Sequence, residues 1–117
     1  MHTAPALRLT AAQIEQLSGY CAQYRSSLWQ EELPTPERNL TLRRIQALQG
    51  TLAKAQEQRE QTLVFSEEEQ HTLKHLLSET LRRAARAPAS QQRTQQVAEI
   101  AELRVLVERT FRPTPML

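Results

Sequence analysis

The residues whose spacing is best suited to metal chemistry are Glu68, His71 and His75. Glu68-x-x-His71 has the spacing of carboxylate-bridged di-iron bundles, and two histidines four residues apart can hold one metal ion across a helical turn. A di-iron centre needs a second such motif, which the sequence lacks. At 100° per residue, both histidines also fall opposite the expected core. We therefore expect a solvated helix face, with no metal and no other cofactor.

Nucleophilic and phosphate chemistry have little support in the sequence. Cys21 is the only cysteine, so one chain can form no disulfide, and its place on an apolar stripe predicts a small buried hydrophobe. Gly19 and Gly50 are isolated glycines, which excludes a glycine-rich phosphate loop. These features predict that the protein is not an enzyme, and they identify no small-molecule substrate.

The densest basic cluster consists of Arg82, Arg83, Arg86 and Arg93. No acidic residue lies between Glu79 and Glu99, so this cluster could engage phosphates, and a nucleic-acid-associated accessory protein is the alternative function. The opposing interpretation is that arginines near the end of a helix complement its dipole. A net charge of only +2 and 4% aromatic residues make the nucleic-acid role the less favoured one.

Composition predicts a helical protein of one domain. The 117 residues include two glycines, 39% apolar and 24% charged residues, which favours helices over sheets. The chain begins without a basic segment followed by an apolar run, and no window approaches the length of a membrane span. We expect a cytoplasmic location and no membrane partner.

Two helix starts carry the same capping signal. Ser66 and Glu69 form an S-x-x-E capping box, in which each side chain bonds the backbone amide of the other residue. Thr10 and Gln13 repeat this arrangement near the N-terminus. In the second and fourth predicted helices, Thr35 and Ser90 are the expected N-caps.

Four helices are expected to position these residues, in one domain over residues 9–111. They are predicted over residues 10–32, 36–63, 66–87 and 90–111, with prolines at the first and last turns. The domain divides into hairpins over residues 9–63 and 64–111, with a flexible lead at residues 1–8 and a flexible tail at residues 112–117. Short turns within each pair of helices predict antiparallel neighbours.

The two halves align at a nearly constant offset. An offset of 56 matches Thr10 with Ser66 and Cys21 with Leu77, and an offset of 55 continues the match after the first turn. The core pairs at this second offset include Ile45 with Ile100, Leu48 with Leu103, and Leu52 with Val107. We expect an all-α antiparallel four-helix bundle built from two similar αα-hairpins, with internal duplication as the hypothesis. The alternative is that any two amphipathic hairpins align after sliding.

Off-stripe apolar residues indicate a protein partner. Val105 and Leu106 lie off the inward stripe of the fourth predicted helix, and Leu40 lies off that of the second. We expect a non-enzymatic protein–protein interaction or scaffolding module that forms homodimers through the apolar outer side of the fourth helix.

Glycines and aromatic residues leave further alternatives open. Gly19 and Gly50 are equidistant from the first turn and opposite the core stripe, where either drift or a closely approaching surface would explain them. Trp29 and Tyr20 either cover the end of the core or, with Tyr24, form an aromatic anchor for a partner.

Overall fold

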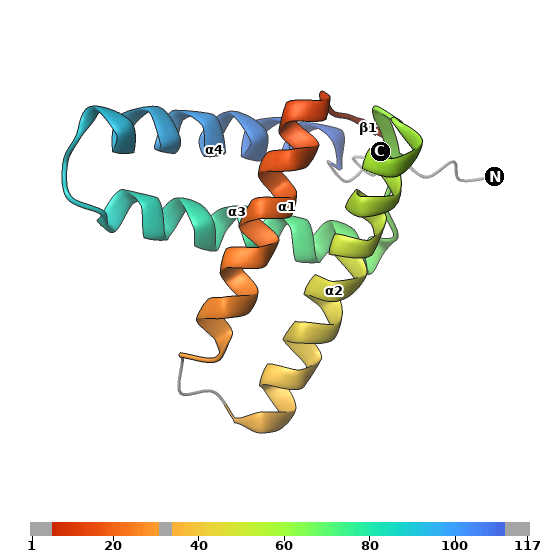
Figure 1. Cartoon of the computed structure of the whole chain (residues 1–117), viewed down its shortest axis with the longest axis horizontal. Coiled ribbons are helices and arrows are strands. Elements are labelled where there is room, and N and C mark those ends of the chain that lie inside the picture. The colour runs from red at the N-terminus through yellow and green to blue at the C-terminus, as the bar shows by residue number, and fades with distance from the viewer. Residues whose placement is uncertain (1–5, 31–33, 112–117) are drawn as a thin grey trace, which may run out of the picture.

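The computed structural model describes residues 6–30 and 34–111. Within these ranges the chain forms four helices and two short strands (Figure 1). In chain order they are β1 (Ala6–Arg8), α1 (Ala11–Leu28), α2 (Thr35–Gln58), β2 (Thr62–Val64), α3 (Glu67–Arg86) and α4 (Gln91–Thr110). The mostly helical fold with four helices agrees with the prediction, whereas the small sheet was not expected.

The helices form two hairpins that cross. In Figure 1, α1 and α2 run steeply down the picture, whereas α3 and α4 run across it. Helix α3 packs against both helices of the first hairpin. The expected bundle, with four helices running alongside one another, is therefore not the arrangement seen. The antiparallel strands lead into α1 and α3 from opposite ends of the sheet.

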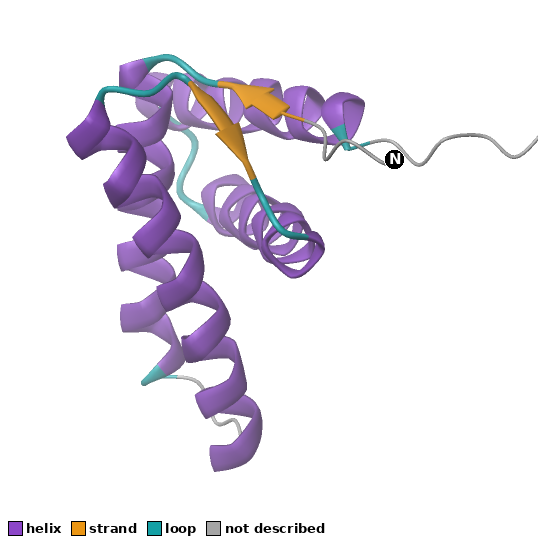
Figure 2. Cartoon of the chain, turned by 90° about the vertical axis from the view of Figure 1, so that its right-hand side faces the viewer, coloured by secondary structure: helices purple, strands orange, loops and turns teal. Residues whose placement is uncertain are grey.

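The sheet joins the two hairpins through one buried pair of leucines (Figure 2). Leu7 pairs with Leu63, and both side chains are buried, while their strand neighbours on either side are exposed. This alternation is the strand pattern of one buried and one solvated face. The prediction of a flexible lead over residues 1–8 is thus wrong for residues 6–8, and residues 1–5 lie outside the described ranges.

Helix α2 is shorter than predicted. It ends at Gln58, and Arg59 adopts a left-handed conformation with φ of 55°. The Arg59 amide donates to the carbonyl oxygens of Ala55 and Gln56, as in a left-handed helix C-cap. The chain then enters β2, so Leu63 reaches the core from a strand and not from the last turn of a helix.

The helix starts follow the predicted caps in three cases out of four. Both sides of the capping box are present at Thr10 and at Ser66, and the Ser90 hydroxyl accepts a hydrogen bond from the Arg93 amide. The prediction for Thr35 is wrong, because Thr35 is already helical and Pro34 occupies the capping position without a side-chain hydrogen bond.

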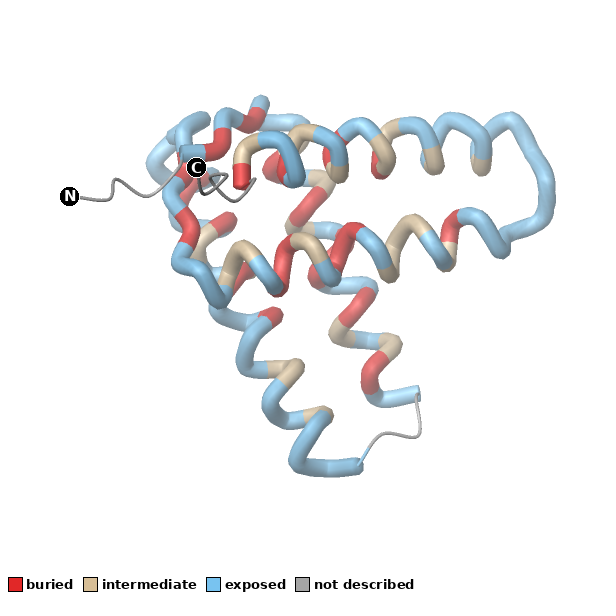
Figure 3. Tube along the Cα trace, turned by 180° about the vertical axis from the view of Figure 1, so that it is seen from behind, coloured by how far each residue is buried: buried red, intermediate tan, exposed pale blue. Residues whose placement is uncertain are grey.

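Apolar side chains from all six elements form the core, along the sides on which the elements face one another (Figure 3). Phe65 and Phe111 meet edge to face with ring centroids 6.1 Å apart, closing the core near the sheet. None of the described helices is long and apolar enough to cross a membrane. The predicted tail over residues 112–117 lies outside the described residues.

Candidate functional site

The outer side of α4 presents one large apolar residue to solvent. Val105 is 54% exposed, as its place on the helical wheel indicates. Leu106 differs from the expectation, because it is partly buried and packs against the core. The reason is that Leu106 lies three residues after the buried Leu103, so both belong to one broad inward stripe.

Charged residues surround Val105 on α4. Arg104 Nε and Glu108 Oε1 form an ion pair of 3.2 Å on one flank. On the other flank, Glu102 and Arg109 make no hydrogen bond or ion pair with any described residue. The site residues predicted from the sequence did not include these four charged residues, Glu102, Arg104, Glu108 and Arg109, although their alternating charge was visible in the sequence. The outer side of α4 therefore combines an apolar centre with charges of both signs.

Other exposed apolar residues lie elsewhere on the molecule. Leu40 is 47% exposed near the start of α2, which is the end of the first hairpin farthest from α4 (Figure 1). Leu40 and Val105 therefore do not share one surface. Trp29, which is 66% exposed, carries the Arg38 guanidinium 5.6 Å from its ring centroid.

Both tyrosines of α1 belong to the core. Tyr20 and Tyr24 are buried, so they cover the hydrophobic interior and do not join Trp29 in an exposed aromatic anchor. Burial, and to a lesser extent the charge of Glu99, raises the pKa of Tyr20. The Tyr24 hydroxyl reaches across to α3, where it lies 3.0 Å from Nε2 of His75.

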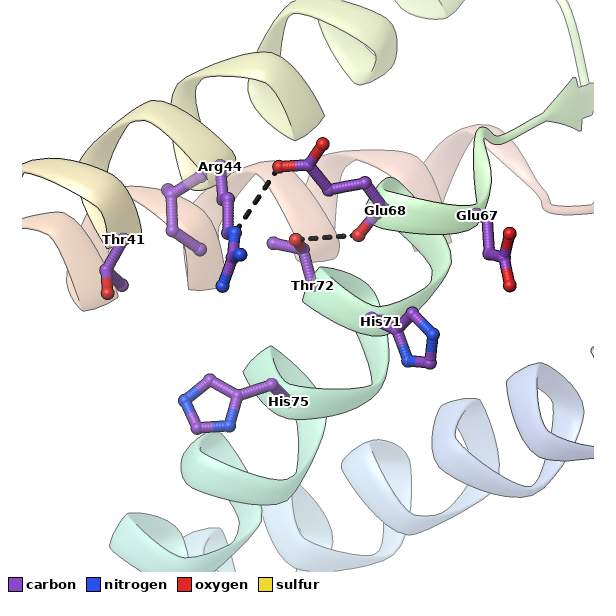
Figure 4. A pocket seen from close by; sticks show the side chains of 8 residues that line it. Thr41, Arg44, Glu67, Glu68, His71, Thr72 and His75 are labelled. Carbon is purple, nitrogen blue, oxygen red and sulfur yellow. Dashed lines mark hydrogen bonds and ion pairs between the residues drawn. The ribbon is translucent and has the colours of Figure 1, made fainter. Parts of the chain in front are cut away.

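A recess of about 660 Å³ lies between α2 and α3 (Figure 4). The Arg44 Nε and Glu68 Oε1 atoms form an ion pair of 3.3 Å across it, and the Thr72 hydroxyl donates to the Glu68 carbonyl oxygen over 2.9 Å. Its lining is completed by Thr41, Ile45, Glu67, His71 and His75. Much of the polar lining is thus already bonded within the chain.

The histidines of this recess do not converge on one point. His71 and His75 are exposed as predicted, but they line the recess and are not on a free outer face. Their rings lie on different sides of α3 in Figure 4, and His75 is bonded to Tyr24. Among the described residues, no three histidine, cysteine or acidic side chains are placed to hold a metal ion. The Glu68 carboxylate is held by Arg44 instead.

The arginine cluster near the α3–α4 turn is largely engaged within the protein. Arg82 forms an ion pair of 2.6 Å with Glu79, and the Arg83 guanidinium lies 5.5 Å from the ring centroid of Tyr24. Arg93 Nη1 donates to the Ala87 carbonyl oxygen over 3.2 Å. The remaining member, Arg86, is exposed. These contacts use side chains that phosphate binding would need.

Cys21 has the environment of a structural residue. Its side chain is fully buried, and burial raises the pKa of the thiol from 9.0 to about 12. A thiol is a weak nucleophile unless it is ionised, so this side chain is unreactive at neutral pH. The placement agrees with the predicted core position.

No protein-family model, curated protein or solved structure matches the chain. The outer side of α4 combines an exposed apolar centre with charges of both signs, of which Glu102 and Arg109 have no ion partner among the described residues.

Proposed function

We propose that the protein is a non-enzymatic interaction module that self-associates through the outer side of α4. The observation that carries the proposal is the 54% exposure of Val105 in a helix whose other bulky apolar residues pack inward. Full burial of an exposed side chain of this kind contributes about 1.5–3 kcal/mol, and covering the exposed part of Val105 contributes roughly half of that. Glu102 and Arg109 beside it supply charges that a partner can pair with.

The test compares two valines of similar exposure, one in α4 and one in β2. Val105→Lys places a charge at the centre of the proposed interface, and Val64→Lys makes the same change on β2, where the valine is 59% exposed. Analytical ultracentrifugation of the full chain over a wide concentration range should show a reversible dimer that Val105→Lys removes and Val64→Lys retains. Circular dichroism should show unchanged helix content in both variants. A wild-type chain that stays monomeric at every concentration would contradict the proposal.

A binding measurement with nucleic acid distinguishes the alternative function from self-association. Binding to mixed nucleic acid that falls steeply with added salt would favour an accessory role for the arginine cluster. Alanine at Arg82, Arg83, Arg86 and Arg93 should then abolish the binding. The contacts of Arg82, Arg83 and Arg93 within the chain make this function the less favoured one.

We also propose that the chain is a duplicated strand–helix–helix unit. Leu7 and Leu63 are 56 residues apart, the offset that relates the two capping boxes at Thr10 and Ser66. These two leucines pair directly in the sheet. Two equivalent residues that pair with each other are the sign of a local twofold axis, as in an isologous contact between identical subunits. We also propose a cytoplasmic location, since Cys21 is buried and forms no disulfide.

A further inference from the structure

We infer that the partner on α4 is a second copy of this chain, bound as an antiparallel α4–α4 pair whose twofold axis passes beside Val105. This inference rests on the proposed function and adds the geometry and the ion pairs of the interface. Its basis is the charge pattern around Val105, which is complementary to itself when it is turned through 180°.

Along α4, the two charged residues on one flank lie at nearly equal distances before and after Val105. Glu102 lies three residues before Val105, and Arg109 lies four residues after it. In two antiparallel helices that cross at Val105, each residue before the crossing meets a residue after it. Glu102 of one copy therefore lies level with Arg109 of the other copy, and the second pair follows by symmetry.

Around α4, the same two charged residues lie on one side of Val105. At 100° per residue, Glu102 and Arg109 lie about 60° and 40° from Val105 on the same flank. A twofold axis perpendicular to the helices sets each flank against the same flank of the other copy. Both ion pairs between copies are therefore on one side of the contact. Neither residue has an ion partner within the described chain, so both charges are available to a second copy.

The opposite flank follows the same rule. Arg104 and Glu108 lie on the other side of Val105, where they pair with each other within one chain. In the antiparallel arrangement, Arg104 of one copy also comes close to Glu108 of the other. Each of the four charged residues that flank Val105 thus has an opposite charge of the other copy close to it. The two Arg104 side chains, each one residue from the axis on the same flank, also come close to each other.

The size of the contact predicts its strength. Two helices that cross over roughly three turns bury less surface than the area of about 800 Å² per partner that stable interfaces bury. We therefore expect a weak dimer, with Kd between about 10 µM and 1 mM. Ion pairs of exposed residues in such a contact should weaken with added salt.

Charge reversal on the full chain tests the geometry. In the isologous pair, Glu102→Arg or Arg109→Glu alone converts two attractive contacts into two repulsive ones, and each should raise Kd at least about tenfold. The double variant E102R/R109E should restore Kd to within about threefold of wild type. An equimolar mixture of the two single variants should form a heterodimer, because each repulsive chain complements the other.

Sedimentation equilibrium measures Kd for each variant and for a control variant. Glu57→Arg reverses an exposed charge on α2 and should leave Kd unchanged. Self-association that single reversals do not weaken, or that neither the double variant nor the mixture restores, would overturn the α4–α4 geometry while leaving the proposed module intact. A wild-type chain that is monomeric up to about 1 mM would overturn both.

Discussion

The outer sides of α2 and α4 differ at several corresponding positions, among them Gly50 and Val105. These residues are 55 apart, the same spacing that relates the buried residues Ile45 and Ile100. An added Cβ at Gly50 would meet no atom within 4 Å, and Val105 is more than half exposed. Neither position is therefore constrained by packing within the described chain. The two hairpins match inside and differ outside, so the surface that is particular to α4 is the better candidate for a binding role.

The same comparison also distinguishes the two halves within the core. Cys21 in α1 corresponds to Leu77 in α3, and both are fully buried. The first half thus has an ionisable side chain where the second has a hydrocarbon. Equivalent positions should respond alike to the same change, and non-equivalent positions should not. Four measurements use this contrast, in order of decreasing expected effect.

The largest effect is expected at the leucine pair of the sheet. Leu7→Ala and Leu63→Ala each remove a buried side chain and should lower the free energy of unfolding by about 2–5 kcal/mol in urea titrations. Because these residues pair with each other, the two losses should agree within about 1 kcal/mol. The exposed Val64→Ala should cost less than about 0.5 kcal/mol. Losses that differ by more than about 2 kcal/mol would contradict the equivalence of the two strands.

The strand pair also shows where sequence reasoning fails. The caps at Thr10 and Ser66 were predictable because each box lies within four residues of chain. Leu7 and Leu63 belong to strands of three residues, which are too short for a period to be seen, and their pairing joins distant parts of the chain. The crossing of the hairpins also involves contacts between distant parts of the chain, so it was not predictable either.

The candidate surfaces show the same limit. The exposure of Val105 followed from helical spacing alone. The inward packing of Leu106 did not, because the width of an apolar stripe depends on what packs against it. Likewise, the contact between Tyr24 and His75 joins α1 to α3, and no local pattern in either helix indicates it.

The second effect concerns alkaline pH and separates Cys21 from Leu77. In the unfolded chain the thiol loses its proton near its ordinary pKa of 9.0, whereas in the folded protein its pKa is about 12. Between these pH values the unfolded chain binds fewer protons, so stability falls as pH rises, and the contribution is complete below about pH 9. The fall from this group approaches about 1.4 kcal/mol per pH unit.

Cys21→Ala should remove this part of the pH dependence. Denaturant titrations at intervals from pH 8 to pH 11 would compare the slope of the variant with that of wild type. The raised pKa of Tyr20 acts in the same direction in both proteins, so only the difference in slope belongs to Cys21. Parallel slopes would show that the thiol pKa in the folded protein equals its value in the unfolded chain, and would contradict the raised pKa.

The third effect is expected at the helix caps. Thr10→Ala and Ser66→Ala each remove a side-chain acceptor from a capping box and should cost about 1 kcal/mol. Thr35→Ala should cost much less, since Thr35 does not cap α2. Thermal unfolding followed by circular dichroism would rank the three variants. A loss at Thr35 as large as that at Ser66 would contradict the helix start described for α2.

The smallest effect is a gain, and it returns to the outer side of α2. Gly50→Ala should raise the free energy of unfolding by about 0.5–1 kcal/mol, because the helix interior favours alanine and the added Cβ meets open space. Gly19→Ala on α1 should do the same for the same reason. Sedimentation equilibrium should find the Kd of the dimer unchanged in both variants. If either alanine weakened the dimer, the glycine faces of the first hairpin, and not α4 alone, would take part in self-association.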